Sequence, residues 1–179
     1  MLEPGLHVPL ASLNEAVADR TVTLMSPSKT FNLSGLSCGF AVIPNRELRQ
    51  RFQAAARDLV PQPNALGYVA CRAAYEAGEI WRVALIDYLR GNRDLLEAFF
   101  SEQLPQFGIS HVEATYLAWI DARCLGERGE AGFFDAAGVR LSDGGPFQAP
   151  GFVRLNFGCP RQTLRDALDR IATAARRIA

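Results

Sequence analysis

Lysine is almost absent from this sequence: Lys29 is the only one among 19 basic residues. The 19 acidic residues balance these charges, so no surplus of one sign favours binding to nucleic acid or to a membrane surface. The sequence also lacks an uninterrupted apolar run long enough to cross a bilayer. Its first residues have neither the basic nor the apolar region of a signal peptide, so we expect a cytoplasmic chain.

Cysteine and histidine are too few and too scattered for a zinc site. No Cys-x-x-Cys pair occurs, and the two histidines, His7 and His111, are isolated. Structural zinc sites need closely spaced ligands of these types. We therefore predict no metal site, and we interpret the histidines as structural or exposed and the cysteines as reduced thiols. The cysteines are Cys38, Cys71, Cys124 and Cys159.

Alternating helical and strand patterns predict an α/β chain. Apolar residues at three- to four-residue spacing indicate helices, and short β-branched or apolar runs indicate strands. Asn45 is a predicted helix cap, and Gly91 leaves open whether the long central helix is continuous. The predicted strands are 21–25, 38–43, 109–113, 115–120, 139–141 and 152–157, and the predicted helices begin near 46, 64, 79, 133 and 161.

Several further residues are assigned to packing or to helix ends. Thr163 and Asp166 resemble a capping box for the last helix, and Arg161 is expected to serve the start of that helix. Aromatic side chains at core-like spacing are predicted to pack internally. These are Tyr68, Trp81, Tyr88, Tyr116 and Trp119.

The segment 26–36 (SPSKTFNLSGL) places Lys29 in a hydroxyl-rich turn between two predicted strands. Taken alone, such a lysine is more often an exposed turn residue than a catalytic one. Ser26 has two open interpretations as well. Its hydroxyl either contacts an anion, together with free backbone N–H groups, or satisfies its own turn.

A second segment, 152–161, contains Arg154 inside an apolar strand. Strand geometry directs Phe152, Arg154 and Asn156 to one face. An arginine grips a carboxylate through two parallel hydrogen bonds, which a lysine cannot do. The alternative is an arginine on the solvated face of a two-layer sheet.

Four stretches in this order resemble the fold-type I pyridoxal-phosphate enzymes of the class I/II aminotransferase group. Among these, the sequence is most similar to the cystathionine β-lyase-like C–S lyases. The stretches are 26–36 (SPSKTFNLSGL), 40–45 (FAVIPN), 115–121 (TYLAWID) and 154–161 (RLNFGCPR).

The resemblance implies pyridoxal 5′-phosphate as cofactor and gives three residues a role. Lys29 would bind the cofactor aldehyde as a Schiff base and then remove the substrate Cα proton. Ser26 would contact the cofactor phosphate, and Arg154 would bind the substrate α-carboxylate. One position departs from many aminotransferases, because Ser37 stands where they have a phosphate-binding arginine. This departure favours the C–S lyase branch.

Only 28 residues precede Lys29, and they contain no Gly-rich phosphate turn, no cofactor-stacking ring and no aspartate for the pyridine nitrogen. We therefore expect the C-terminal portion of such an enzyme, an α/β chain that holds the end of the large domain followed by an α+β small domain. Residues 1–62 would belong to the large domain, and residues 63–179 would form the interdomain helix and the small domain. The strands between 21 and 43 would then lack the rest of their sheet and expose edges.

The implied reaction is β-elimination on a sulfur amino acid, which gives pyruvate, ammonia and a thiol. The family also implies a homodimer that acts on small amino-acid substrates, with no nucleic-acid or membrane partner. We expect the isolated chain to be inactive without the missing groups. Two alternatives remain: a class I/II aminotransferase that uses the same Lys29 and Arg154, and a non-catalytic remnant or interaction module.

Overall fold

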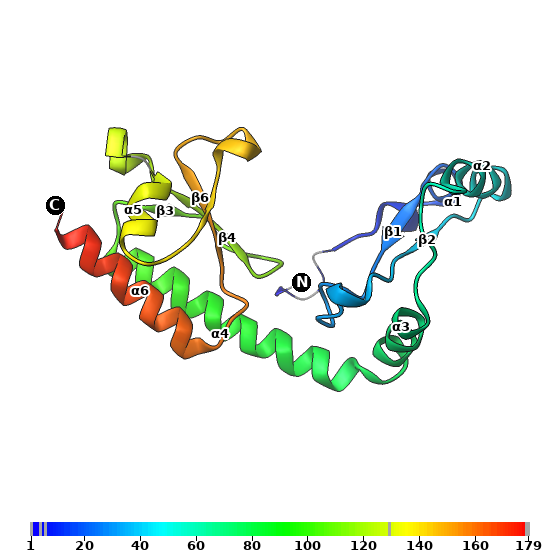
Figure 1. Ribbon diagram of the computed structural model, residues 1–179, viewed down its shortest axis with the longest axis horizontal. Helices are drawn as coiled ribbons and strands as arrows, with labels where there is room; N and C mark the ends of the chain where they lie inside the picture. Colours follow the sequence, from blue (N-terminus) through cyan, green and yellow to red (C-terminus); the bar gives the residue numbers. More distant parts are fainter. Residues whose placement is uncertain (1, 4, 6, 129, 178–179) are drawn as a thin grey trace. The chain divides into compact units, whose positions relative to one another are not determined.

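The computed structural model describes residues 2–3, 5, 7–128 and 130–177 (Figure 1). The chain divides into two compact units. The first unit is Gly5–Leu85, and the second unit is Ile86–Ala179 together with Met1–Pro4. Helices and strands occur in both units, which confirms the predicted α/β class. No helix within the described ranges is both long and apolar enough to cross a membrane.

The elements agree with most predicted segments in type and order. The first unit holds α1 (Glu15–Ala18), β1 (Thr23–Met25), β2 (Phe40–Val42), α2 (Arg46–Ala56) and α3 (Ala65–Ala77), and α4 (Glu79–Gln103) continues from it into the second unit. The second unit holds β3 (Gly108–Ile109), β4 (Leu117–Asp121), α5 (Glu130–Ala136), β5 (Ser142–Asp143), β6 (Phe152–Asn156) and α6 (Arg161–Arg176).

In the first unit, β1 and β2 form a two-stranded antiparallel sheet, with Thr23 opposite Val42. All three residues of β2 are exposed, as expected for strands that lack the rest of a sheet. The predicted cap of α2 is confirmed, because the Asn45 side chain accepts a hydrogen bond from the Leu48 N–H at 2.9 Å. The helix ends at Ala56, several residues before the prolines that were expected to stop it.

Helix α4 is continuous through Gly91 over 25 residues, which settles the open question about its middle. The reason for a glycine there is steric. A Cβ added at Gly91 would lie 2.5 Å from the Nη2 atom of Arg161, so this glycine makes room for the arginine beside the helix. The cost in helix propensity, about 1 kcal/mol relative to alanine, is offset by that contact.

The second unit is built around a four-stranded antiparallel sheet in the order β3-β4-β6-β5. In β6, Val153 and Leu155 are buried while Arg154 and Asn156 lie on the other face, which confirms the predicted alternation. Figure 1 shows α6 alongside the second half of α4. Both helices bury apolar stripes, which include Leu96 and Phe100 of α4 and Leu164, Leu168 and Ile171 of α6.

The start of α6 is held by tertiary contacts and not by the predicted capping box. The helix begins at Arg161, whose backbone N–H donates to the Tyr88 hydroxyl at 2.7 Å, and no side-chain cap is present at Pro160. Thr163 therefore lies inside the first turn. Asn92, fully buried, donates to the Phe157 and Cys159 carbonyls at 2.9 Å and accepts from the Arg161 Nε at 3.0 Å. The role expected for Arg161 is thus confirmed.

The predicted packing of the aromatic residues is only partly correct. Trp119 packs against Phe147 and Phe152, with ring centroids 5.9 Å apart in both pairs. Tyr68, in contrast, is 55% exposed, and Trp81 is also exposed. Tyr68 and Trp81 lie in the first unit, where the described residues leave the apolar side chains of α3 and the start of α4 uncovered, and Tyr88, in the second unit, is 42% exposed as well.

Candidate functional site

Lys29 lies on a loop that connects β1 and β2, residues 26–37, called here the Lys29 loop. The loop is anchored on both sides of the lysine. Pro27 is fully buried, and the Phe31 ring contacts the Tyr75 and Trp81 rings with centroids 5.8 and 6.2 Å apart. The Phe31 N–H also donates to the Pro27 carbonyl at 2.8 Å, which closes one turn around Lys29.

The Lys29 side chain is exposed, and its amine has no hydrogen bond or ion pair to any described residue. A firmly held backbone that carries a free primary amine suits a group that must react with an incoming carbonyl compound. The structure therefore leaves the Lys29 amine accessible to an incoming molecule. The same placement is compatible with the simpler interpretation of an exposed turn lysine.

The Ser26 hydroxyl is used inside its own turn. It donates to the Cys38 carbonyl at 2.8 Å, accepts from the Ser28 N–H at 3.1 Å, and lies 2.7 Å from the Ser28 hydroxyl. These contacts match the local-turn interpretation of Ser26. They also hold two exposed or half-exposed hydroxyl groups next to Lys29, where an anion could accept hydrogen bonds from them.

Ser37 closes the Lys29 loop in a left-handed conformation, with φ of 48°. The preceding Leu36 carbonyl accepts a hydrogen bond from the Asn64 side chain at 3.2 Å, and the same Asn64 caps α3 through the Gly67 N–H at 2.9 Å. One asparagine thus joins the end of the loop to the start of α3. This contact lies far from Ser37 in sequence, and local patterning did not reveal it.

Arg154 lies in β6, opposite Trp119 of β4 and Ser142 of β5. Its guanidinium donates from Nη2 to the Ser142 hydroxyl at 3.3 Å and lies 4.9 Å from the centroid of the Phe147 ring. Its Nε atom is buried and has no hydrogen-bond partner in the described part of the chain. Buried polar groups are nearly always paired, so an unpaired Nε indicates a missing acceptor.

A carboxylate is one acceptor that suits the Arg154 guanidinium. A carboxylate accepts two parallel hydrogen bonds from adjacent guanidinium nitrogens. The Ser142 hydroxyl accepts a hydrogen bond from Nη2, and the Phe147 ring covers one face of the Arg154 guanidinium. Together these contacts fix the plane of the guanidinium. The motif around Arg154 gave no sign of these two residues, because both lie outside it, in the Gly-rich stretch before β6.

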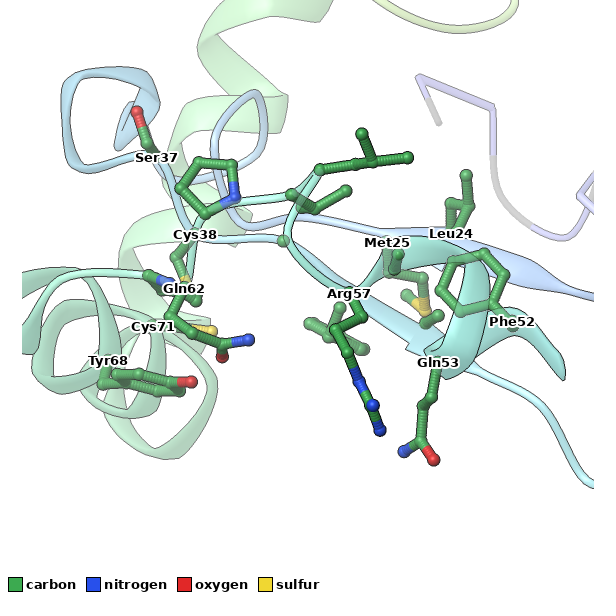
Figure 2. Close-up of a pocket in the computed structure, with 18 of the residues that line it drawn as sticks. Leu24, Met25, Ser37, Cys38, Phe52, Gln53, Arg57, Gln62, Tyr68 and Cys71 are labelled. Carbon is green, nitrogen blue, oxygen red and sulfur yellow. The ribbon is translucent and has the colours of Figure 1, made fainter. Parts of the chain in front are cut away.

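A large hollow of about 1140 Å³ lies in the first unit, and Figure 2 shows the side chains that line it. Its walls are mainly apolar and come from β1, β2, α2 and the segment between α2 and α3. Neither Lys29 nor Ser26 lines it, whereas Ser37 and Tyr68 do. Of the predicted site residues, Ser26 and Lys29 share one loop of the first unit, and Arg154 lies in the second unit.

The histidines and acidic residues form no metal site within the described ranges, because no three suitable ligands come together. His111 is instead part of an ion-pair group in the second unit. Its Nδ1 lies 2.9 Å from Glu97 and its Nε2 lies 3.6 Å from Glu3. The hydrogen bond to Glu97 raises the pKa of His111, and Glu3 is in turn paired with the buried Arg93.

Comparison with known proteins places these features in a family. Residues 3–171 match the family Aminotransferase class I and II. Cystathionine beta-lyase PatB of Bacillus subtilis (strain 168) is 37% identical over 186 residues, a match that covers 97% of this chain and 46% of PatB. The crystal structure of OvoB is similar with a TM-score of 0.92 at 48% identity, over 97% of this chain and 46% of that one.

A third similar structure is that of cystalysin from Treponema denticola, which contains a pyridoxal 5′-phosphate cofactor. It has a TM-score of 0.88 at 29% identity and covers 99% of this chain and 47% of its own. The chain therefore spans less than half the length of these relatives. The predicted partial length is confirmed, whereas the predicted position at the C-terminal end of the enzyme is not confirmed by these matches.

The family match covers most of the chain, and the structural similarity extends over both units. Relatives named as cystathionine β-lyases recur among the matches, which agrees with the branch that the sequence resembles. The chain belongs to the class I and II aminotransferase family, in the neighbourhood of its cystathionine β-lyase-like members.

Proposed function

We propose that this chain is part of a pyridoxal-phosphate-dependent C–S β-lyase that acts on small sulfur-containing amino acids. The observation that carries the proposal is Lys29, the single lysine of the sequence, with an unpaired amine on a loop anchored at Pro27 and Phe31. Relatives described as cystathionine β-lyases and as a C–S lyase with bound cofactor support the reaction type.

The residues of the Lys29 loop fit the proposed cofactor. Pyridoxal phosphate, when bound, supplies an aldehyde that joins to amines and a ring that withdraws electrons from the substrate Cα. The Lys29 amine is free to hold the aldehyde. The hydroxyls of Ser26 and Ser28 are close enough to each other to contact one phosphate group together, once Ser26 turns away from the Cys38 carbonyl.

The chain's own residues then have two tasks. The Lys29 amine, when neutral, accepts the proton from the substrate Cα. The Cβ–S bond breaks, the sulfur leaves as a thiolate, and hydrolysis of the remaining three-carbon enamine gives pyruvate and ammonia. Arg154 orients the substrate by binding its α-carboxylate, to which the unpaired Nε donates.

The second candidate is a class I/II aminotransferase. A probable N-succinyldiaminopimelate aminotransferase of Mycobacterium tuberculosis, 34% identical over 120 residues, favours it. Ser37, in place of a phosphate-binding arginine, favours the lyase. A product assay on the complete enzyme distinguishes the two, because a lyase releases pyruvate and thiol from L-cystathionine without a keto-acid acceptor.

We further propose that the complete enzyme is a cytoplasmic homodimer, and that residues 1–62 and 63–179 belong to its large and small domains. The chain spans less than half the length of its relatives, so groups that complete the site belong to the part it does not cover. We therefore expect the isolated chain to bind the cofactor at Lys29 without turnover. A remnant without catalytic use would show no turnover, and its Lys29 would bind the cofactor no more tightly than the amine of a free lysine does.

Covalent trapping tests the cofactor site directly. The chain is mixed with pyridoxal phosphate, reduced with borohydride and digested with trypsin. A free Lys29 yields peptides 21–29 and 30–46, whereas a modified Lys29 resists cleavage and yields 21–46 with the added cofactor mass. The Lys29→Arg variant keeps the charge and should show no adduct in this segment. An adduct confined to the N-terminal amine would overturn the proposed site, and turnover of L-cystathionine by the isolated chain would overturn its expected inactivity.

A further inference from the structure

Two of the four cysteines lie against each other in the first unit. Cys38 precedes β2 and is 7% exposed, and Cys71 lies in the second turn of α3 and is half-buried. Burial and the neighbouring Cys38 thiol both raise the pKa of Cys71, which lowers its thiolate fraction and slows its reaction with peroxide, so the case for the pair rests on geometry. Figure 2 shows the two sulfur atoms next to each other at the edge of the hollow. Both thiols are free in this structure.

Gly67 explains how the two thiols come together. A Cβ added at Gly67 would lie 3.5 Å from the Cβ of Cys38, so Cys38 packs directly on α3, one turn before Cys71. Side chains on a helix point toward its N-terminus, so the Cys71 thiol leans toward that same place. A disulfide requires Cβ–Sγ bonds that converge in this way.

The cysteine pair is also connected to the Lys29 loop. The Ser26 hydroxyl donates to the Cys38 carbonyl at 2.8 Å, which ties the start of the loop to Cys38. At the other end, the Leu36 carbonyl accepts from Asn64 at the start of α3. These are individual hydrogen bonds, each worth about 1 kcal/mol, so the ends of the loop can separate from Cys38 and α3 while Pro27 and Phe31 stay packed. A covalent bond at Cys38 would remove that freedom.

We propose that Cys38 and Cys71 form an oxidation-sensitive pair whose disulfide fastens the Lys29 loop to α3. With a peroxide as oxidant, the more accessible Cys71 sulfur takes one peroxide oxygen as a sulfenic acid and releases water. The Cys38 thiol then attacks that sulfur, the S–O bond breaks, and a second water leaves as the S–S bond forms. Two thiols are oxidised by two electrons, and one peroxide is reduced to two waters.

Peptide mapping tests the cross-link in this chain. Trypsin separates all four cysteines, because Cys38 lies in peptide 30–46, Cys71 in 58–72, Cys124 in 124–128 and Cys159 in 155–161. After dilute hydrogen peroxide, we expect one new species, peptides 30–46 and 58–72 joined with the loss of two hydrogen atoms. It should disappear on reduction and in Cys71→Ser, but persist in the control Cys124→Ser. Random pairing, or sulfinic acids without a cross-link, would overturn the proposal.

A lysine-specific protease tests the coupling to the loop. Lys29 is the only lysine, so cleavage of the folded chain reports opening of this loop alone. We expect the peroxide-treated chain to be cut several-fold more slowly than the reduced chain, and Cys71→Ser to be cut at the same rate before and after peroxide. A cross-linked chain that is cut as fast as the reduced chain would show that the disulfide does not hold the Lys29 loop.

Discussion

At Arg154, the contacts of the guanidinium differ from one nitrogen to the next. Nη2 has a long hydrogen bond to Ser142, the plane lies over Phe147, and Nε is buried without a partner in the described part of the chain. An unpaired buried polar group destabilises the folded state by about 1–3 kcal/mol. Such a group is expected to persist where it has a function. Under the proposed function, Nε binds the substrate carboxylate.

A substitution of Arg154 separates stability from function. Arg154→Met removes the unpaired Nε and keeps an unbranched side chain. This gain should exceed the loss of the Ser142 and Phe147 contacts, so we expect the free energy of unfolding in urea to rise by a net of roughly 1 kcal/mol. In the control Arg123→Met, an exposed arginine loses its hydrogen bonds to Asp121, so stability should not rise. A clear loss of stability in Arg154→Met would contradict this account.

His111 makes the stability of the chain depend on pH. Its hydrogen bond to Glu97 raises the pKa of His111 above the value of the unfolded chain. Protonated His111 therefore stabilises the fold below the unfolded pKa, and this contribution is lost as pH rises through the folded pKa. The charges that face it are Glu97 and Glu3, which favour protonation, and Arg93, which opposes it.

The stability difference between the wild type and His111→Gln should therefore be largest near pH 6 and shrink by about pH 8. Urea unfolding at several pH values, followed by tryptophan fluorescence, measures it. In the control variant Glu97→Gln, the neutral amide does not attract the imidazolium by charge. The effect of His111→Gln on stability should therefore depend less on pH in that variant than in the wild type. A difference that grows with pH would mean that His111 is not stabilised in its charged form.

At the scale of elements, polar contacts join the start of α6 to α4. Arg161 packs in the space above Gly91, where its Nε donates to buried Asn92 and its Nη2 donates to the Tyr88 carbonyl at 3.0 Å. Its guanidinium also lies 4.7 Å from the Tyr88 ring centroid. The hydrogen bond to Asn92, the hydrogen bond to the Tyr88 carbonyl and the contact with the Tyr88 ring therefore all depend on the absence of a side chain at Gly91.

The effect of Gly91→Ala on the free energy of unfolding should therefore have opposite signs with arginine and with alanine at position 161. In the wild type, the new Cβ displaces Arg161 and leaves Asn92 short of a donor, so we expect a loss of roughly 1 kcal/mol despite the better helix propensity. In an Arg161→Ala background the clash is gone, and Gly91→Ala should stabilise the chain by about 0.5–1 kcal/mol. A double-mutant cycle in urea measures both, and equal effects in the two backgrounds would exclude the steric explanation.

At the scale of the whole chain, the two units differ in how well they bury their apolar residues. The second unit has a continuous core that includes Leu96, Phe100 and Ile120, all fully buried. The first unit leaves Leu24 71% exposed, and its two-stranded sheet covers little. Buried apolar area is the main source of folding stability, so we expect the first unit to be less stable than the second.

The first unit should therefore unfold at a lower urea concentration than the second. Each unit has one tryptophan, Trp81 in the first and Trp119 in the second. The variants Trp119→Phe and Trp81→Phe each leave a single fluorescent reporter, and circular dichroism of both checks that the substitutions themselves leave the fold intact. A single coincident transition in the two variants would show that the chain unfolds as one cooperative body.

Local patterning determined much of this protein. Helical and strand spacing predicted most elements, Asn45 was correctly predicted as a cap, and period-two alternation correctly placed Arg154 on the open face of β6. These features depend on neighbours within a few residues, which a sequence displays directly. The resemblance to the family rests on motifs of the same kind, and the family match confirms it.

Only the tertiary structure decided the features that join distant segments. The Tyr88 hydroxyl holds the start of α6 where a capping box was predicted, and Gly91 is tolerated because Arg161 fills its space. Phe147 sets the Arg154 plane, and Gly67 lets Cys38 reach α3. In each case the partner lies on another element, so the contact exists only after the chain has packed, and no local pattern of residues encodes it.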